Sequence, residues 1–354
     1  MPADFLRQAK EKGFMPTFVY PTAAELHLVA QDFLPRLTAN RPAFEILPIT
    51  TKDDDLIIWE QVGNFTGLQQ IRGLNGSPSR VNAIGGKRYM MVPGAYGEFA
   101  YINEDEITRR RSFGTFADTL DLSDLVLMKQ QHLLQRRYDR IEQIIWTLLT
   151  LGTFSVSSPT GGIVHTDTFP LQTFTAPVQW NAANIALATP LADMRAMQLK
   201  ALGHSIVFDS TSILYLNRVN INAILANTNQ ADLGGKKVMY GMSILDLSAV
   251  NTIFQGNDLP QIQPMEAGYY DETSTFQRFI ATGTGVLVGK RTDGSPIGNY
   301  VMTRNANNPG VAPGAYTKVV DEGETKIPRA LQVHDGHNGG PQIVFPSAVV
   351  TLAC

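Results

Sequence analysis

The sequence predicts an α+β protein that combines one very long helix with a long β-hairpin and scattered strands. Residues 121–151 carry the strongest helical pattern, and residues 56–103 read as two strands joined by a long glycine-rich connection. Short strand-like runs follow from about residue 237 onward. They lie between turns and do not alternate regularly with helices, which is typical of α+β proteins. The sequence contains no repeat of fixed period.

Length and composition indicate a folded chain with extensive covered surface. At about 150 residues per domain, 354 residues predict two domains or slightly more. Hydrophobic residues make up 44% of the chain, which excludes a mainly disordered protein. Only 17% of the residues are charged, against about 25% on average, and this favours large surfaces covered by neighbouring molecules.

Charge, cysteine content and hydropathy exclude several classes of protein. The net charge is −3, and no basic tail predicts tight sequence-specific binding to nucleic acid. Cys354 is the only cysteine, so an intramolecular disulfide and a multi-cysteine zinc site are excluded. Residues 1–13 lack a signal-peptide run, and the longest apolar stretch, residues 144–156, is shorter than the roughly 18–20 residues that span a bilayer. We expect a soluble protein that is intracellular when made.

Residues 1–50 are expected to form an N-terminal arm. Thr22 and Glu25 have the spacing of a helix capping box. The apolar face that follows predicts a helix that Pro35 bends or stops, and it consists of Leu26, Val29, Ala30, Phe33, Leu34 and Leu37. The alternative is a surface helix packed on the chain's own core.

The most unusual segment is residues 56–103. Residues 56–62 and 87–92 read as antiparallel strands, and six of the residues from 63 to 86 are glycine. With about 20 residues per side, such a hairpin reaches roughly 65 Å, and a lone two-stranded ribbon is marginal in water. We therefore predict that the ribbon lies on another copy of the protein. The alternative is an irregular surface loop or an extra hairpin in a local sheet.

A charge cluster follows this ribbon in the sequence. It brings three acids close to three arginines, namely Glu104, Asp105, Glu106, Arg109, Arg110 and Arg111. One interpretation is a solvated, self-paired cluster, in which each pair is worth under about 1 kcal/mol. The other is a contact between subunits at the root of the ribbon.

Residues 121–151 predict a helix of roughly 45 Å, about three times the mean length. Asp121 or Ser123 can cap its start, Gly152 stands at the usual position after its end, and no proline interrupts it. One apolar stripe runs along it through Leu127, Leu134, Tyr138, Ile141, Ile145 and Leu148. Further patterns predict a hairpin over 153–165, helices over 190–202 and 212–225, and strands at 205–208, 279–288, 299–303 and 343–352.

No constellation of residues predicts an enzyme, a metal site or a cofactor site. The run from Gly283 to Lys290 lacks the first glycine of a phosphate loop, and Arg291 stands where the loop needs Ser or Thr. His334 and His337 lie in a stretch that reads as a glycine-rich loop and have no supporting cluster of ligands. Cys354, at a chain end expected to be flexible, lacks the fixed base that a nucleophile needs.

The order of elements resembles that of a known family, the lambda-type major capsid protein E family of tailed bacteriophages. Three stretches carry the resemblance, namely residues 92–107 (VPGAYGEFAYINEDEI), 180–193 with 205–209 (SIVFD), and 341–352 beginning PQIVFP. The resemblance implies the Hong Kong 97-type fold. It implies an N-terminal arm (1–50), an extended loop over a neighbouring subunit (51–107), a peripheral domain (108–204) with a spine helix at 119–152, a mostly axial domain (205–340), and a C-terminal strand (341–354) returning to the body.

The resemblance also implies partners and a location. Hexamers and pentamers of this chain would build an icosahedral shell around double-stranded DNA in a virion, after assembly in the host cytoplasm. A separate scaffolding protein, a portal and a decoration protein are the expected partners, and no cofactor is expected. The expected inter-subunit contacts are the charge cluster together with Trp59, Arg72, Arg80, Lys87 and Arg88.

Two alternatives remain open at this stage. An encapsulin-type nanocompartment shares the fold but encloses enzymes, so a cargo-enzyme gene beside the coding sequence would replace the portal, terminase and tail genes of a phage. The other alternative is an α+β enzyme with an unrecognised site.

Overall fold

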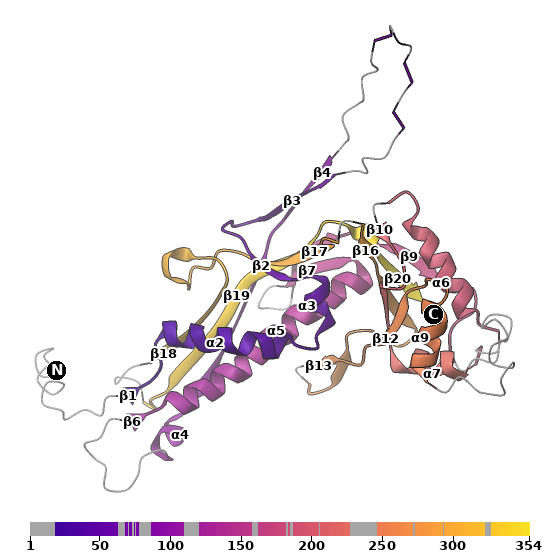
Figure 1. Ribbon diagram of the computed structural model, residues 1–354. Coiled ribbons are helices and arrows are strands. Elements are labelled where there is room, and N and C mark those ends of the chain that lie inside the picture. The colour runs from indigo at the N-terminus through magenta and orange to yellow at the C-terminus, as the bar shows by residue number, and fades with distance from the viewer. Residues whose placement is uncertain are drawn as a thin grey trace, which may run out of the picture.

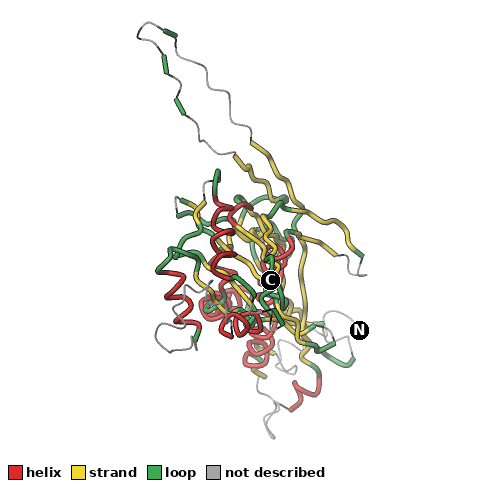
Figure 2. The backbone as a smooth tube through the Cα atoms, turned by 90° about the vertical axis from the view of Figure 1, so that its right-hand side faces the viewer, coloured by secondary structure: helices red, strands yellow, loops and turns green. Residues whose placement is uncertain are grey.

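The computed structural model describes residues 18–62, 86–109, 120–157, 162–181, 183–184, 187–204, 206–226, 246–271, 273–292, 294–322 and 327–354. Between 62 and 86 it also describes residues 68–69, 71–72, 74 and 76–77. Figures 1 and 2 show an elongated body from which a two-stranded ribbon projects. Within the described residues, no helix is both long enough and apolar enough to cross a bilayer.

Two five-stranded sheets and one long helix, α5 (Ser123–Leu151), organise the body. The first sheet has the order β18-β19-β17-β2, and β5 pairs with the free side of β19. Its strands are β2 (Ile49–Thr51), β5 (Gly94–Ile102), β17 (Gly298–Met302), β18 (Ala315–Asp321) and β19 (Leu331–Ile343). The helix α5 lies along this sheet and buries its apolar stripe against it (Figure 1).

The second sheet has the order β12-β11-β15-β20-β9 and lies beyond the C-terminal end of α5 (Figure 1). It is built from β9 (Gln172–Thr175), β11 (Ile213–Leu216), β12 (Gln261–Pro264), β15 (Thr284–Val288) and β20 (Val349–Ala353). Three helices lie beside it, namely α6 (Pro190–Gln198), α7 (Arg218–Ala226) and α9 (Leu247–Gln255).

Short elements complete the architecture. The two-stranded pairs are β1 (Phe18–Val19) with β6 (Leu120–Asp121), β3 (Ile57–Val62) with β4 (Gly86–Met91), β7 (Thr153–Ser157) with β8 (Ile163–Thr168), β10 (Ile206–Val207) with β16 (Lys290–Arg291), and β13 (Gly268–Tyr270) with β14 (Phe276–Arg278). The remaining helices are α2 (Ala23–Thr38), α3 (Pro42–Ile46), α4 (Glu104–Arg109) and three 3₁₀ turns at Leu199–Ala201, Pro309–Val311 and Pro346–Ala348.

The long helix spans nearly the predicted residues, although its N-cap is Leu122 and not Asp121 or Ser123. The Asp121 carboxylate accepts a hydrogen bond from the Ser123 backbone N–H at 2.9 Å, and the helix ends at Gly152 in a left-handed conformation with φ +66°. A Cβ at Gly152 would lie 2.7 Å from the Phe169 carbonyl oxygen, inside van der Waals contact. Both the backbone conformation and the space therefore require glycine here.

Gly152→Ala is accordingly expected to lower the free energy of unfolding by at least about 1–2 kcal/mol, the usual cost of a left-handed L-residue. Chemical denaturation followed by circular dichroism measures this. Gly203→Ala is the matched control, because Gly203 has φ +80° and no atom of the described residues lies within 4 Å of its Cβ position. An equal loss in both variants would show that the contact with Phe169 adds nothing.

The segment that begins at residue 18 packs on its own chain. This agrees with the alternative interpretation of residues 1–50, a surface helix on the chain's own core. The capping box of Thr22 and Glu25 is present, and Leu26 is fully buried against the first turns of α5. Of the two outcomes expected at Pro35, a bend or a stop, the stop does not occur, since α2 continues to Thr38 with the proline inside it.

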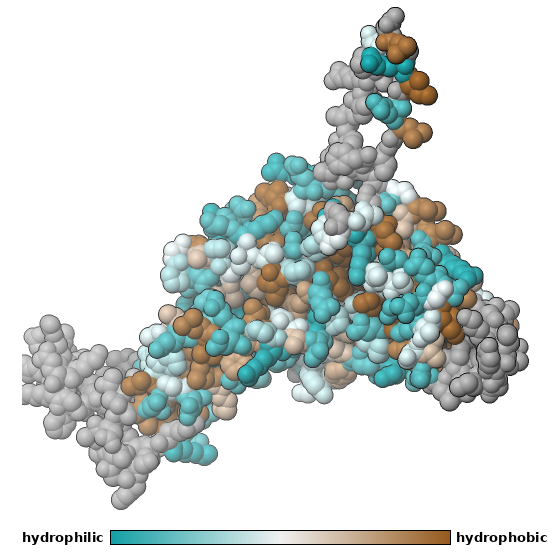
Figure 3. All heavy atoms as spheres, in the orientation of Figure 1, coloured by the Kyte–Doolittle hydropathy of each residue, from teal (hydrophilic) through white to brown (hydrophobic). Residues whose placement is uncertain are grey.

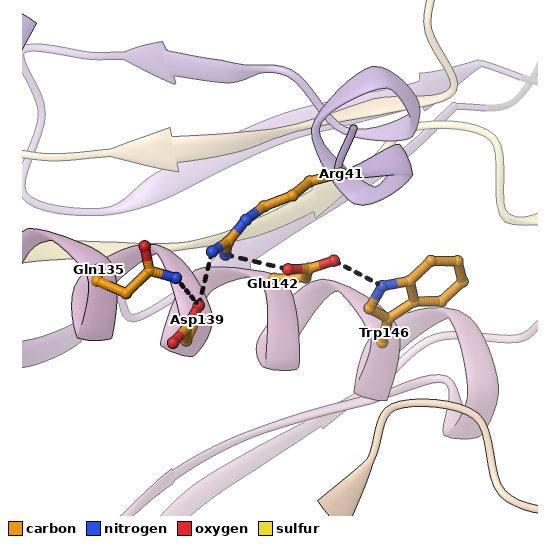
Figure 4. Close-up of polar contacts among 5 residues, drawn as sticks. All are labelled: Arg41, Gln135, Asp139, Glu142 and Trp146. Carbon is orange, nitrogen blue, oxygen red and sulfur yellow. Dashed lines mark hydrogen bonds and ion pairs between the residues drawn. The ribbon is translucent and has the colours of Figure 1, made fainter. Parts of the chain in front are cut away.

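Arg41 fixes this segment to α5 (Figure 4). Its guanidinium lies 2.8 Å from the Asp139 carboxylate and 3.1 Å from that of Glu142, which in turn accepts a 3.4 Å hydrogen bond from the Trp146 indole N–H. The Glu142 side chain is only 4% exposed, and burial raises its pKa although Arg41 opposes the shift. Residues from α2 to α3 are thus held on the spine helix by a partly buried ionic contact.

Several sequence expectations are corrected by the structure. The segment 212–225 begins with a strand, β11, before α7 starts at Arg218, because its run of buried residues pairs with β12 and β15 in the middle of the second sheet. The stretch containing His334 and His337 forms the 13-residue strand β19 and not a loop. Glycine is tolerated in this strand because tyrosine side chains lie across it, and a Cβ at Gly336 would meet the Tyr316 hydroxyl at 2.7 Å.

The chain end also differs from expectation, and both sheets take strands from either side of the expected domain boundaries. Cys354 is buried rather than flexible, and desolvation raises the pKa of its thiol to about 12. The strands β17, β18 and β19, expected mostly in the axial domain, belong to the sheet that packs on the spine helix. The strand β9, expected in the peripheral domain, belongs to the second sheet. The sheets therefore do not divide at residues 204 and 340. The final segment finishes β19 at Ile343 and then enters the second sheet as β20.

Candidate assembly surfaces

The base of the projecting ribbon is anchored by one of its two faces. In the antiparallel register, Trp59 lies opposite Tyr89, and Ile57 lies opposite Met91. The Trp59 ring stacks on Tyr89 at 5.4 Å and on Phe169 of the body at 6.0 Å between centroids, and it is 6% exposed. The structure therefore places Trp59 in the chain's own core, where it fixes the direction in which the ribbon leaves the body.

The opposite face of the ribbon is turned outward. It pairs Ile58 with Met90, which is 66% exposed, and Glu60 with Arg88. Lys87 is exposed beside it, opposite Gln61. Both cations expected on this strand therefore lie at the surface.

The described residues of the connection beyond the ribbon expose aliphatic side chains almost completely. Leu68 is 99% exposed, and Ile71 and Leu74 are each 101% exposed. Figure 3 shows apolar residues standing out along this projection. Arg72, which lies between Ile71 and Leu74 in the sequence, is one of the expected inter-subunit contacts. It is exposed, and its guanidinium donates a hydrogen bond to the Gly76 carbonyl at 3.0 Å. Arg80 lies outside the described residues.

This aliphatic row, Leu68, Ile71 and Leu74, was not predicted, although the sequence contains its pattern. Leucine and isoleucine recur at every third position through a stretch rich in glycine and polar residues. Burial of one such exposed leucine or isoleucine by a partner would contribute about 1.5–3 kcal/mol to the free energy of association. Three of them fully exposed on one extended segment form a surface that suits contact with another molecule.

The charge cluster lies at a different place from the one expected. The nine residues of β5 carry the chain away from the ribbon, so α4 lies at the far end of the spine helix (Figure 1). Asp105 pairs with Arg109 at 2.9 Å within α4, where both side chains are at least 70% exposed, and Glu106 pairs with Lys129 of α5 at 3.0 Å. Glu104 is exposed. Arg110 and Arg111 lie outside the described residues.

Buried polar contacts join the spine helix to the first sheet. The Arg137 guanidinium lies 2.8 Å from the Asp335 carboxylate, with side chains 7% and 2% exposed, and the Thr317 hydroxyl donates to the same carboxylate at 2.7 Å. Burial raises the pKa of Asp335, although Arg137 opposes this. His337 stacks on Tyr96 and lies 3.0 Å from the Tyr300 hydroxyl.

Comparison with solved structures gives matches over nearly the whole chain. A protein of an Escherichia coli CFT073 prophage, described as its candidate capsid protein, superposes with a TM-score of 0.61 at 11% identity, covering 95% of this chain and 99% of the other. A phage-related protein from Bordetella bronchiseptica RB50 gives 0.55 at 10% identity, covering 94% and 97%.

The chain has the fold of these phage proteins. The expected Hong Kong 97-type fold is therefore confirmed, with its long spine helix and projecting ribbon. Scans against protein-family models and curated proteins find no match.

Proposed function

We propose that this chain is the major capsid protein of a tailed double-stranded-DNA bacteriophage, which assembles as hexamers and pentamers into an icosahedral shell. The observation that carries the proposal is the projecting ribbon on a Hong Kong 97-type fold, with Leu68, Ile71 and Leu74 uncovered. Such a segment is energetically incomplete in one copy, because a two-stranded ribbon alone is marginal in water. A neighbouring subunit that buries it supplies the missing contacts.

The proposal extends to partners and location. The chain's main partner is itself, and its role is structural and not enzymatic. A separate scaffolding protein, a portal and a decoration protein complete the particle, and the chain resides in the virion after assembly in the host cytoplasm. The contacts between subunits include Arg72, Lys87, Arg88 and the charge cluster. Trp59 is left out, since its own chain covers it.

Replacing Leu68, Ile71 and Leu74 together by serine tests the proposal. Each protein is tested with and without the scaffolding protein. We expect the wild type to form capsomers or closed shells. We expect the triple variant to remain monomeric, with an unchanged circular dichroism spectrum. The reason is the loss of about 1.5–3 kcal/mol per buried side chain. Sedimentation velocity and electron microscopy measure the assembly.

Gln69→Ser is the matched control, because it changes an exposed polar residue of the same segment. Assembly of the control should equal that of the wild type. A wild-type chain that stays monomeric under all of these conditions, or a triple variant that assembles normally, would contradict the proposal.

A further inference from the structure

A cleft of about 690 Å³ lies between the spine helix, β5 and β7. Residues 95–98 of β5 and 153–156 of β7 line two of its walls, and α5 provides its floor. This volume is within the range of ligand-binding pockets. The cleft is distinct from the ribbon and from the charge cluster.

Three strands line the cleft, namely β5, β7 and residues 335–337 of β19. Side chains on a strand point alternately to opposite faces, so a cavity over one face touches every second residue. Here the cleft touches four consecutive residues of β5 and of β7, and also residues 335–337 of β19, which β5 and β18 pair on both sides, so it reaches backbone as well as side chains. Among the described residues, β5 pairs only with β19 and β7 only with β8. Each of these two strands, β5 and β7, thus keeps an open edge, and open edges bind extended peptides as added strands.

The floor of the cleft offers unused hydrogen-bond donors. Arg136 is paired with Glu98 at 2.9 Å, and this hydrogen bond lowers the pKa of Glu98. The buried Arg137 is paired with Asp335 through its terminal nitrogen, but its Nε has no hydrogen-bond partner among the described residues. Arg140 is exposed and donates to the Gln143 side-chain oxygen at 3.0 Å, and no carboxylate in the described part of the chain pairs with it.

These cations suit a carboxylate rather than a polyanion. Three arginines against Glu98 and Asp335 leave the cleft one positive charge, which one acidic side chain neutralises. Apolar side chains complete the lining, namely Leu133, Ile144 and Phe154, each of which is less than a tenth exposed. A nucleic-acid backbone would bring several phosphates to a site with a single free guanidinium.

We propose that this cleft binds an extended acidic peptide segment of a partner chain, which adds to an open strand edge and places a carboxylate on Arg140. The proposal goes beyond the capsid function and does not rest on it, because all walls of the cleft belong to one chain. It can therefore be tested on the unassembled protein, and its failure would leave the assembly result unaffected.

Selection from a displayed library of random hexapeptides on the purified chain provides the test. We expect enrichment of sequences in which Asp or Glu is flanked by apolar residues. Fluorescence polarisation should show that Arg140→Glu weakens the enriched peptides at least tenfold, whereas Lys200→Glu, which reverses an exposed cation on another part of the surface, leaves binding unchanged. N-methylation of alternate backbone nitrogens should abolish binding if the peptide pairs as a strand.

Four results would overturn the proposal. They are the absence of enrichment, enrichment without acidic residues, binding that survives Arg140→Glu, and full competition by inorganic phosphate or by a single-stranded oligonucleotide. The last would assign the cleft to a simple anion or to nucleic acid. Circular dichroism of Arg140→Glu verifies that the variant is folded.

Discussion

Asp335→Ala is expected to lower the free energy of unfolding by about 3–5 kcal/mol, because it leaves the buried Arg137 charge without its carboxylate. Both side chains are less than a tenth exposed, so the guanidinium left behind stays largely desolvated. The Thr317 hydroxyl also loses its acceptor. The pair joins the middle of the spine helix to the longest strand of the first sheet, and its loss therefore weakens the contact between the two largest elements of the fold.

Glu98→Ala is the matched control for this prediction. Glu98 forms the neighbouring pair with Arg136, where both side chains are about half exposed, and such a pair is worth under about 1 kcal/mol. Replacing both buried partners, with Arg137→Met and Asp335→Leu, should recover most of the loss because no uncompensated charge remains. Urea denaturation measures all three variants. A loss for Asp335→Ala no greater than that for Glu98→Ala would show that the buried pair is not significant for stability.

The fold could be predicted as far as local patterns determine it. The spine helix was predicted because its period, its capping residues and Gly152 all act within one segment. The strand β11 was missed because its partners, β12 and β15, are far away in sequence, and a short apolar run is read equally well as a helix. Likewise, the glycines of β19 suggest a loop until Tyr316 is seen lying across Gly336.

The candidate surfaces were predictable in part for a similar reason. The ribbon is excessively long in the sequence, and this alone predicts a partner in another copy. The cleft could not be predicted, since it depends on a gap between β5 and β7 that only the tertiary arrangement creates. Arg136 and Arg140 read as a solvated helix face in the sequence, and nothing in their spacing distinguishes a cleft floor from an open surface.

His337 is expected to make the fold sensitive to acid. It is 1% exposed, and burial, together with the nearby Arg137 charge, lowers its pKa to about 3. In the unfolded chain a histidine titrates near 6.5. Between these values the unfolded state binds one more proton than the folded state, so the free energy of unfolding falls as the pH falls, by up to about 1.4 kcal/mol per pH unit.

The contribution of His337 is isolated by comparison with His337→Gln, which cannot titrate but can still hydrogen-bond the Tyr300 hydroxyl. Tyr96, Arg137 and Asp335 surround the same site, and their effects on stability cancel in the comparison because both proteins contain them. Urea denaturation from pH 7 to pH 4.5 should show the wild type losing about 2–3 kcal/mol more than the variant. Parallel pH profiles would mean that the imidazole accepts a proton without unfolding, and hence that water reaches it between the spine helix and β19.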